Sequence, residues 1–198
     1  MILLDPDLDI GSSRKRPGLL LRPVVAASPA SLKPASPTAG WQRSSLPWAE
    51  RLPTPGTLRK FLSEAQQAAG LSGQVTVLLT TDKAICSLNA RFRGKNKPTD
   101  ILSFASTNPA PHGEEIAGDL AISVETARKQ AAEQGHTLGV ELRVLILHGL
   151  LHLAGYDHDT DAGRMQRRER QLRAKLGLPQ GLIERAASKR TKTRRCKP

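Results

Sequence analysis

This sequence contains few aromatic residues and few cysteines. Phe, Trp and Tyr together make up 3% of its 198 residues, so a folded core has to be built mainly from aliphatic side chains and alanine. The two cysteines, Cys86 and Cys196, are far apart and fit no metal-ligand spacing. This argues against a disulfide-stabilised scaffold and indicates ordinary thiols in a reducing compartment.

The sequence also has no apolar run long enough to span a membrane. Residues 18–25 form a short apolar stretch behind three basic residues, as in a secretory signal peptide, but Arg22 and Pro23 interrupt it. The acid-free, serine-rich stretch 11–49 is closer to an organelle transit peptide, although the aspartates before it argue against one. We therefore expect a cytoplasmic protein with no membrane partner.

Acidic residues are scarce on both flanks of the chain, and this produces the net charge of +12. Residues 11–55 hold seven Lys and Arg against one acid, and residues 185–198 hold seven against none. Residues 56–184 are nearly balanced, with 16 basic and 14 acidic side chains. Basic flanks can neutralise phosphates without reading a sequence. A solvated tail without a specific partner explains the C-terminal run equally well.

Hydrophobic periodicity and turn residues predict alternating helices and strands from Thr57 onward. Strands are expected at 74–80, 101–104 and 120–122. Five helices are expected, and the first three run from Thr57 to Gly70, from a cap at Asp82 through Phe92, and from Ser123 to Gly135. In the second of these, Ile85, Leu88 and Phe92 are expected to face inward. The last two run from Thr137 or Gly139 through Leu151 and from Thr160 or Asp161 to Gly177. This alternation predicts an α/β fold, in which a small mixed β-sheet packs against several α-helices in a single layer-type domain.

The composition divides the chain into four segments. Residues 1–10 include a short apolar run that is a candidate first strand of the core domain. Residues 11–55 carry eight of the fourteen prolines and predict a Pro/Ser-rich disordered insertion or linker. Residues 56–184 form the predicted domain, and residues 185–198 a basic disordered tail.

Three of the five histidines lie within the eleven residues 148–158. His148 and His152 are four residues apart, so on a helix they lie on the same face. Gly155 can end that helix in a left-handed turn and direct His158 back toward the other two. Three converging imidazoles leave a fourth position open, as in catalytic rather than structural zinc sites. We therefore predict one Zn²⁺ per chain, bound by these three histidines.

The spacing His-x-x-x-His-x-x-Gly-x-x-His also occurs in the metzincin proteases. Those enzymes need a glutamate directly after the first histidine as general base, and Gly149 occupies that position here. The motif therefore indicates a metal hydrolase that is not a peptidase. A pair of histidines at helical spacing is ordinarily just a polar helix face, but the third histidine and the intervening glycine favour a metal site.

A cluster of cations precedes the strand expected at 101–104. Arg91, Arg93, Lys95 and Lys97 fall within seven residues. Arginine binds phosphate bidentately and can stabilise charge that develops in a transition state. Taken alone, the run is explained better as a solvated loop between a helix and a strand.

The motif at residues 148–158 resembles the signature of the YbeY family, which are bacterial metal-dependent endoribonucleases linked to rRNA maturation. The resemblance extends to residues 88–104 and 118–122 and covers roughly residues 57 to 178. Ala105 departs from the family, which usually has proline after the Leu-Ser-Phe sequence, and the long segment 11–55 departs as well.

The resemblance implies a YbeY-like catalytic domain over residues 56–184 that cleaves single-stranded RNA with a bound metal. It also implies a role in 16S rRNA 3′-end maturation and ribosome quality control, with the small ribosomal subunit and its proteins as partners. Arg93 matches the family's functional arginine, so Arg93 and His148 are the expected catalytic residues. Arg93, Lys95 and Lys97 are the expected RNA contacts.

Several roles stay open at the level of the sequence. Asp100 either fixes the turn into the next strand or supports a ligand histidine. Asp157 either orients a histidine or water or caps the helix exit, and the 2′-hydroxyl of RNA is an alternative nucleophile. Asn89 either lines the cleft or caps a helix end. For His136 we expect a structural hydrogen bond rather than a fourth ligand position.

Two other functions remain compatible with these residues. One is a zinc hydrolase of another substrate, such as a peptide or small amide, against which Gly149 and the clustered cations count. The other is a non-catalytic, zinc-containing ribosome assembly or RNA-binding factor. Arg93 would serve binding and cleavage alike, so the sequence hardly separates that factor from the enzyme.

Overall fold

The computed structural model describes residues 1–8, 51–106, 115–158, 160–179 and 181–183. The chain divides into two compact units, Met1–Leu8 with Leu46–Pro198 and, separately, Asp9–Ser45. The second unit lies outside the described residues, as do most of the predicted insertion at 11–55 and the whole of the predicted tail at 185–198. All the helices and strands described belong to the first unit.

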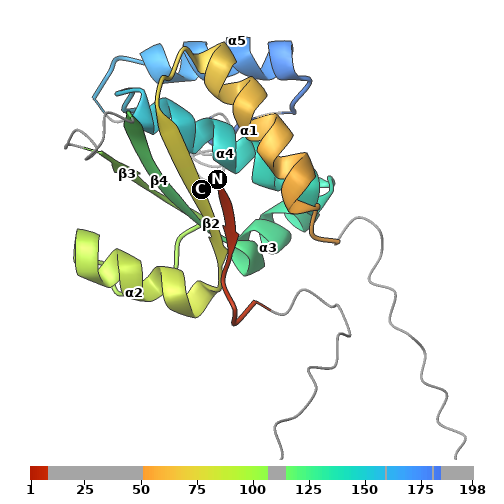
Figure 1. Ribbon diagram of the computed structural model, residues 1–198, viewed down its shortest axis with the longest axis vertical. Helices are drawn as coiled ribbons and strands as arrows, with labels where there is room; N and C mark the ends of the chain where they lie inside the picture. Colours follow the sequence, from red (N-terminus) through yellow and green to blue (C-terminus); the bar gives the residue numbers. More distant parts are fainter. Residues whose placement is uncertain (9–50, 107–114, 159, 180, 184–198) are drawn as a thin grey trace, which may run out of the picture. The chain divides into compact units, whose positions relative to one another are not determined.

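A four-stranded mixed sheet with the order β1-β2-β4-β3 lies at the centre of this unit (Figure 1). β1 (Ile2–Leu4), β2 (Gln74–Thr80) and β4 (Ile116–Ser123) run parallel, and β3 (Ile101–Ala105) runs antiparallel to β4. The predicted small mixed sheet is therefore confirmed, although β4 begins at Ile116 rather than at Leu120.

Helices cover both faces of the sheet. Within the described residues they are α1 (Pro55–Ala69), α2 (Asp82–Arg93), α3 (Val124–Gln134), α4 (Leu138–Leu153) and α5 (Arg164–Leu176). α2 lies on one side of the sheet, whereas α1, α4 and α5 lie on the other (Figure 1). Side chains alternate along β4 accordingly, since Leu120 and Ile122 belong to the main core while Ala121 packs with Ile85 of α2.

Hydroxyl side chains begin four of these helices. Thr54, Thr81, Ser123 and Thr137 each accept a hydrogen bond from a backbone amide in the first turn of the helix that follows. Glycines in the left-handed conformation end α1, α2, α3 and α5. The predicted cap at Ser123 is confirmed, and Thr137 rather than Gly139 caps α4, whose first residue is Leu138.

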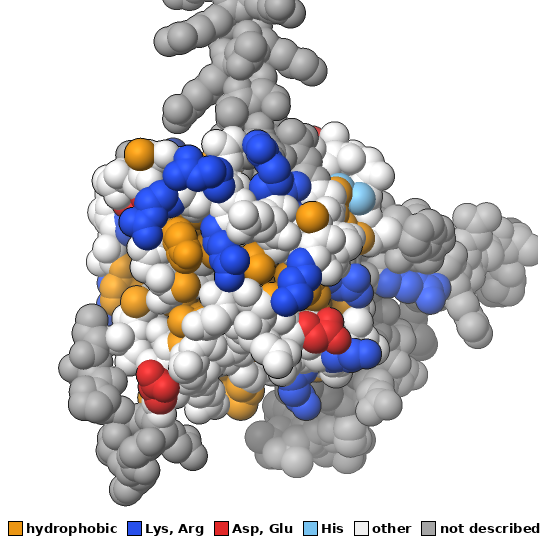
Figure 2. Space-filling model, turned by 90° about the horizontal axis from the view of Figure 1, so that it is seen from above, with side chains coloured by type: hydrophobic (Ala, Val, Ile, Leu, Met, Phe, Trp, Pro, Cys, Tyr) orange, Lys and Arg blue, Asp and Glu red, His pale blue; other side chains and the backbone are white. Residues whose placement is uncertain are grey.

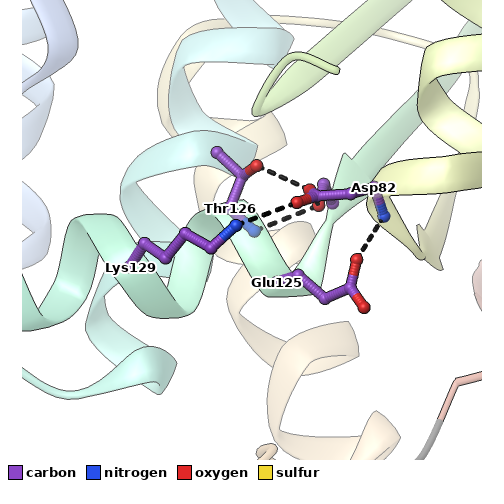
Figure 3. Close-up of polar contacts among 5 residues, drawn as sticks. Asp82, Glu125, Thr126 and Lys129 are labelled. Carbon is purple, nitrogen blue, oxygen red and sulfur yellow. Dashed lines mark hydrogen bonds and ion pairs between the residues drawn. The ribbon is translucent and has the colours of Figure 1, made fainter. Parts of the chain in front are cut away.

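Asp82 was expected to cap α2, but it instead joins the first turns of α2 and α3 (Figure 3). Its carboxylate accepts hydrogen bonds from the hydroxyls of Ser123 and Thr126 and from the ammonium group of Lys129, while its amide donates to the Glu125 carboxylate. Burial raises the pKa of Asp82, but these hydrogen bonds and the Lys129 charge outweigh burial and lower its pKa overall. Asp82 is thus a tie between two helices.

Two further expectations are wrong. Phe92 does not face inward, because it is 56% exposed at the end of α2, where its ring contacts the ring of Phe104 at a centroid distance of 5.1 Å. α5 begins at Arg164, not at Thr160 or Asp161. The amides of Thr160 and Asp161 both donate to the carbonyl of Asp157, so this stretch forms turns before the helix begins.

α4 is the central helix, and the described structure buries most of its residues, as expected for a helix that is apolar nearly all round. Gly149 lies against the sheet, where a Cβ atom would come within 2.7 Å of the Ile101 and Leu120 side chains. This close approach holds α4 on β3 and β4. Among the described helices, none combines the length and the apolar character needed to cross a membrane.

Candidate metal centre

The three histidines of the 148–158 motif meet at the C-terminal end of α4. His148 and His152 lie on adjacent turns of the helix, with ring centroids 4.8 Å apart. Gly155 follows the helix with φ of +83°, and the chain turns so that the His158 ring lies 5.7 Å from the His148 ring and 5.4 Å from the His152 ring. His148 is buried, His152 half-buried and His158 exposed.

The nitrogen positions fit a single divalent ion. One ring nitrogen from each histidine lies within 4.8 Å of the other two, and the Nε2 atoms of His148 and His152 are 3.2 Å apart. Two imidazole ligands of a tetrahedral zinc ion are about 3.3 Å apart when each Zn–N bond is about 2.0–2.1 Å. The buried-to-exposed gradient leaves one side of the cluster open to solvent.

The cluster also favours the uncharged form of His152. Burial, followed by the neighbouring His148 and His158, lowers the pKa of His152 to about 4. A neutral imidazole is the form that coordinates a metal, so little proton release accompanies binding at this ligand near neutral pH.

Glu169 of α5 is part of this site, and the sequence reasoning missed it. Its Oε1 lies 3.2 Å from Nδ1 of His148, and the Glu169 side chain is fully buried. A carboxylate only accepts, so Nδ1 of His148 carries the proton and Nε2 presents its lone pair to a metal. The available signal was periodicity, because Met165, Glu169 and Leu172 occupy one buried face of α5.

Gly181 packs directly on the Glu169 carboxylate. A Cβ atom at Gly181 would lie 2.4 Å from Oε2 of Glu169 and 2.9 Å from Nε of Arg173. Within the described chain, Oε2 of Glu169 has no hydrogen-bond partner. Contact with Gly181 therefore confines the carboxylate on the side away from His148.

The predicted RNA contacts lie on a different element from the histidines. Arg93 is the last residue of α2, and Lys95 and Lys97 follow it in the connection to β3, all three exposed. Asn89 is 3% exposed. Its side-chain amide donates to the backbone carbonyl of Lys97 at 2.8 Å, and its backbone carbonyl accepts from the backbone amide of Lys95. Asn89 therefore anchors residues 94–97, which we call the basic loop, to the end of α2.

Each of the two candidate aspartates contacts residues of a turn next to it. The Asp100 carboxylate accepts hydrogen bonds from the amide of Ile101, the hydroxyl of Thr99 and the side-chain amide of Gln130, so it fixes the start of β3. Asp157 accepts from the Thr160 hydroxyl at 2.9 Å in the turn after α4. The carboxylate that contacts His148 is Glu169.

His136 lies outside the cluster, in the connection between α3 and α4. Its Nε2 is 3.1 Å from the carboxylate of Glu141, which is fully buried. This contact agrees with the structural role expected for His136. The remaining histidine, His112, lies outside the described residues.

Comparisons with known proteins find one matching family model, several similar sequences and a similar solved structure. A family model described as "Endoribonuclease YbeY" matches residues 54–177. A protein named Endoribonuclease YbeY from Koribacter versatilis is 53% identical over 129 residues, which cover 65% of this chain and 82% of the relative. One of the same name from Solibacter usitatus is 46% identical and covers 68% of this chain and 90% of the relative. A solution structure of a Thermotoga maritima protein aligns at 26% identity with a TM-score of 0.45 over 63% of this chain and 85% of that protein.

Proposed function

This chain belongs to the YbeY endoribonuclease family and is an RNA-cleaving hydrolase, and from that premise we propose that it cuts single-stranded RNA with one Zn²⁺ held by His148, His152 and His158. The observation that carries the proposal is the convergence of three imidazole nitrogens within 4.8 Å of one another. Their open side matches a catalytic rather than a structural metal site.

A metal in this position supplies Lewis acidity, which makes water more acidic and stabilises charge on a phosphoryl group. The chain's own residues hold the ion, orient His148 and bind the phosphate. The three histidines bind the ion, and Glu169 holds the proton of His148 on Nδ1 so that Nε2 faces the metal. Arg93, at the exposed end of α2, clamps the phosphate and stabilises developing charge.

Lys95 and Lys97 extend the phosphate contacts beyond Arg93. Both are exposed in a loop whose backbone Asn89 fixes, so the two charges are presented in a defined position. A single RNA strand can follow such a positive loop without base-specific hydrogen bonds. We assign His148 and Arg93 the catalytic roles, and Lys95 and Lys97 a binding role.

The biological substrate that we propose is precursor 16S rRNA, cut during 3′-end maturation and ribosome quality control in the cytoplasm. Small ribosomal subunits and their proteins are the proposed partners. Membership of the family supports this proposal. Incubation of purified protein with small subunits that carry 3′-extended rRNA tests it, because shortened 3′ ends are expected with the wild type and not with His148→Ala.

Cleavage of a labelled single-stranded RNA tests the proposed chemistry. We expect the zinc-loaded wild type to cut it, and a chelator or His148→Ala to abolish cutting. His112→Ala is the control, because it removes a histidine that is not in the 148–158 motif. Equal cutting by His148→Ala would reveal a contaminating nuclease, and an inactive zinc-loaded wild type would refute the assignment. The complementary duplex RNA should resist cleavage if the enzyme acts on single strands.

A further inference from the structure

Phe92 is the most exposed large apolar side chain among the described residues. It is 56% exposed in the last turn of α2, whereas Met1, Leu3 and Ile116 are 50% exposed or less. A single exposed apolar residue is normal on a folded protein, so exposure by itself identifies no site. The neighbours of the ring decide what it can bind.

Two neighbours hold the Phe92 ring at the surface. The ring of Phe104 on β3 contacts it at a centroid distance of 5.1 Å and an interplanar angle of 67°, the edge-to-face geometry that aromatic pairs prefer. Phe104 packs in turn on the buried residues between α2 and the sheet. The guanidinium of Arg91 lies 5.2 Å from the centroid of the Phe92 ring. Phe92 and Phe104, which we call the aromatic pair, are therefore anchored in the core at one end and exposed at the other.

Positive charge surrounds the exposed end of the aromatic pair. Arg91 and Arg93 flank Phe92 in the chain, Lys95 and Lys97 follow in the basic loop, and all four are exposed. Residues 83–99 include no acidic residue. Proteins hold single-stranded nucleic acid with this combination, in which cations bind the phosphates and aromatic rings stack on the bases.

Positive charge alone does not identify a contact with RNA. Figure 2 shows the side of the molecule on which α5 lies, and Lys and Arg side chains are spread across that side too. Cations of α5 and α1 have contacts of their own, since Arg167 donates to the carbonyl of Ala162 and Lys60 is 4.0 Å from Glu64. The aromatic pair is an observation independent of charge, and it is what marks the end of α2 as an RNA contact.

β3 connects the aromatic pair to the candidate metal centre. α2 and α4 lie on opposite faces of the sheet, of which β3 is an edge strand (Figure 1). The backbone of Phe104 and the side chain of Leu153 meet at Gly118, where a Cβ atom would overlap the Phe104 carbonyl oxygen and lie 2.8 Å from Cδ2 of Leu153. Leu153 is the last residue of α4 and directly follows His152. One edge strand thus stands between the aromatic pair and the histidines.

We propose that Phe92, supported by Phe104, stacks on an unpaired base of the RNA strand that the metal centre cuts, and that this contact contributes to a preference for single strands. The inference rests on the proposed function. The stacked base flanks the cut site, because β3 stands between the ring and the histidines. Bases in a duplex are already paired and stacked on one another, so their faces are closed to the ring.

The test compares three RNA probes of equal length on the full, zinc-loaded chain, namely a single strand, the same strand built from abasic nucleotides, and the duplex. Affinity is measured by fluorescence anisotropy directly after mixing, and a gel confirms that the RNA is uncut. Phe92→Ala should bind the single strand about 5-fold to 150-fold more weakly than the wild type, the range for loss of one base–aromatic stack. Its affinity for the abasic strand and for the duplex should equal that of the wild type.

Two further variants serve as controls. Phe92→Tyr keeps an aromatic ring and should keep the wild-type affinity for the single strand. Leu3→Ala removes an exposed apolar side chain from β1, at the opposite edge of the sheet from β3, and should bind all three probes as the wild type does. The slope of log affinity against log salt should be the same in Phe92→Ala and wild type, because the substitution removes no charge.

Three results overturn the inference. Wild-type affinity of Phe92→Ala for the single strand removes the stacking contact. An equal loss on the single strand and the abasic strand, or a shallower salt slope, would mean that the ring only shapes the basic loop. Altered sedimentation of Phe92→Ala with unaltered RNA affinity would assign the ring to a contact between copies of the chain.

Cleavage by the zinc-loaded wild type distinguishes this inference from the proposed function. If the wild type cuts RNA while Phe92→Ala binds all three probes as the wild type does, only the role of Phe92 is refuted. If the wild type does not cut RNA, the proposed function is refuted whatever the affinities of Phe92→Ala are.

Discussion

Oε1 of Glu169 lies 3.2 Å from Nδ1 of His148, and this contact joins α5 to the first histidine of the candidate metal centre. His148 is 5% exposed and Glu169 fully buried, so neither group is solvated well enough to lose its partner without cost. Within the described structure the contact makes α5 part of the candidate metal centre, although none of the three clustered histidines belongs to α5.

Removal of the Glu169 carboxylate should weaken metal binding. Glu169→Ala is expected to lower zinc affinity by about 10–100-fold, because His148 loses the group that fixes its tautomer and ring orientation. Glu169→Gln should lose less, since its amide oxygen still accepts from Nδ1. Competition with a chromophoric chelator measures both. Glu64→Gln, an exposed glutamate on α1, is the control. Wild-type affinity in Glu169→Ala would refute the positioning role.

A side chain at position 181 should act on the metal through Glu169. The Cβ of Gly181→Ala would meet Oε2 of Glu169 at 2.4 Å, so the carboxylate has to shift and its contact with His148 loosens. We expect a smaller loss of zinc affinity than in Glu169→Ala. The double variant identifies the route, because Gly181→Ala should cost nothing further once Glu169 is alanine. Additive losses would show that position 181 acts independently of Glu169.

The basic loop should lose its shape when Asn89 is replaced. Asn89→Ala removes the hydrogen bond to the Lys97 carbonyl and leaves that carbonyl in need of a partner. RNA affinity is expected to fall while zinc affinity stays at the wild-type value, because the histidines lie on another element. Arg93→Ala should show the same pattern with a larger loss of cleavage. A parallel fall in zinc content would mean that Asn89 supports the whole domain rather than the loop.

Asp82 should contribute to stability in a way that depends on pH. Its folded pKa lies below the ordinary value of about 3.8, so its contribution is present above that value and is lost as the pH falls through the folded pKa. Asp82→Asn should therefore lower the free energy of unfolding at pH 7 by on the order of 1 kcal/mol, with a smaller difference from wild type near pH 3.

Urea unfolding at both pH values measures the effect of Asp82→Asn. Asp7→Asn removes another, exposed aspartate and serves as the control. A difference between Asp82→Asn and wild type that stays constant from pH 7 to pH 3 would show that the carboxylate charge is not what ties α2 to α3.

Local rules located most of the helices and strands in the sequence. β2 has the predicted bounds, Gln74–Thr80, because a run of β-branched and leucine residues is bounded by turn residues. Gly70, Gly135 and Gly177 end helices where expected, because each adopts a left-handed conformation that glycine reaches at least cost. Ser123 caps α3 through its hydroxyl. These signals depend only on neighbours in the chain.

Contacts between distant residues could not be read in the same way. Phe92 fits the periodic face of α2 but lies beyond the edge of the core, where Phe104 covers only part of its ring. The turns after Asp157 combine backbone hydrogen bonds with side-chain contacts, in which the Thr160 hydroxyl donates to Asp157 and the Asp161 carboxylate accepts from the Met165 amide, and Thr160 and Asp161 therefore precede the helix rather than begin it. In the sequence Glu169 stands among arginines, and nothing local indicates its partner. The structure places it against His148, which lies 21 residues earlier. The clustering of His148, His152 and His158 was the exception, since all three come from one short segment.

The packing of Gly149 restricts which reactions this scaffold can acquire by single substitutions. A glutamate there would put its first side-chain carbon within 2.7 Å of Ile101 and Leu120, on the face of α4 that points into the sheet. The single substitution Gly149→Glu would therefore not supply a protease-like base, because the helix would first have to move off the sheet. Selection for new hydrolytic chemistry on this fold should instead act on residues around the open side of the metal centre.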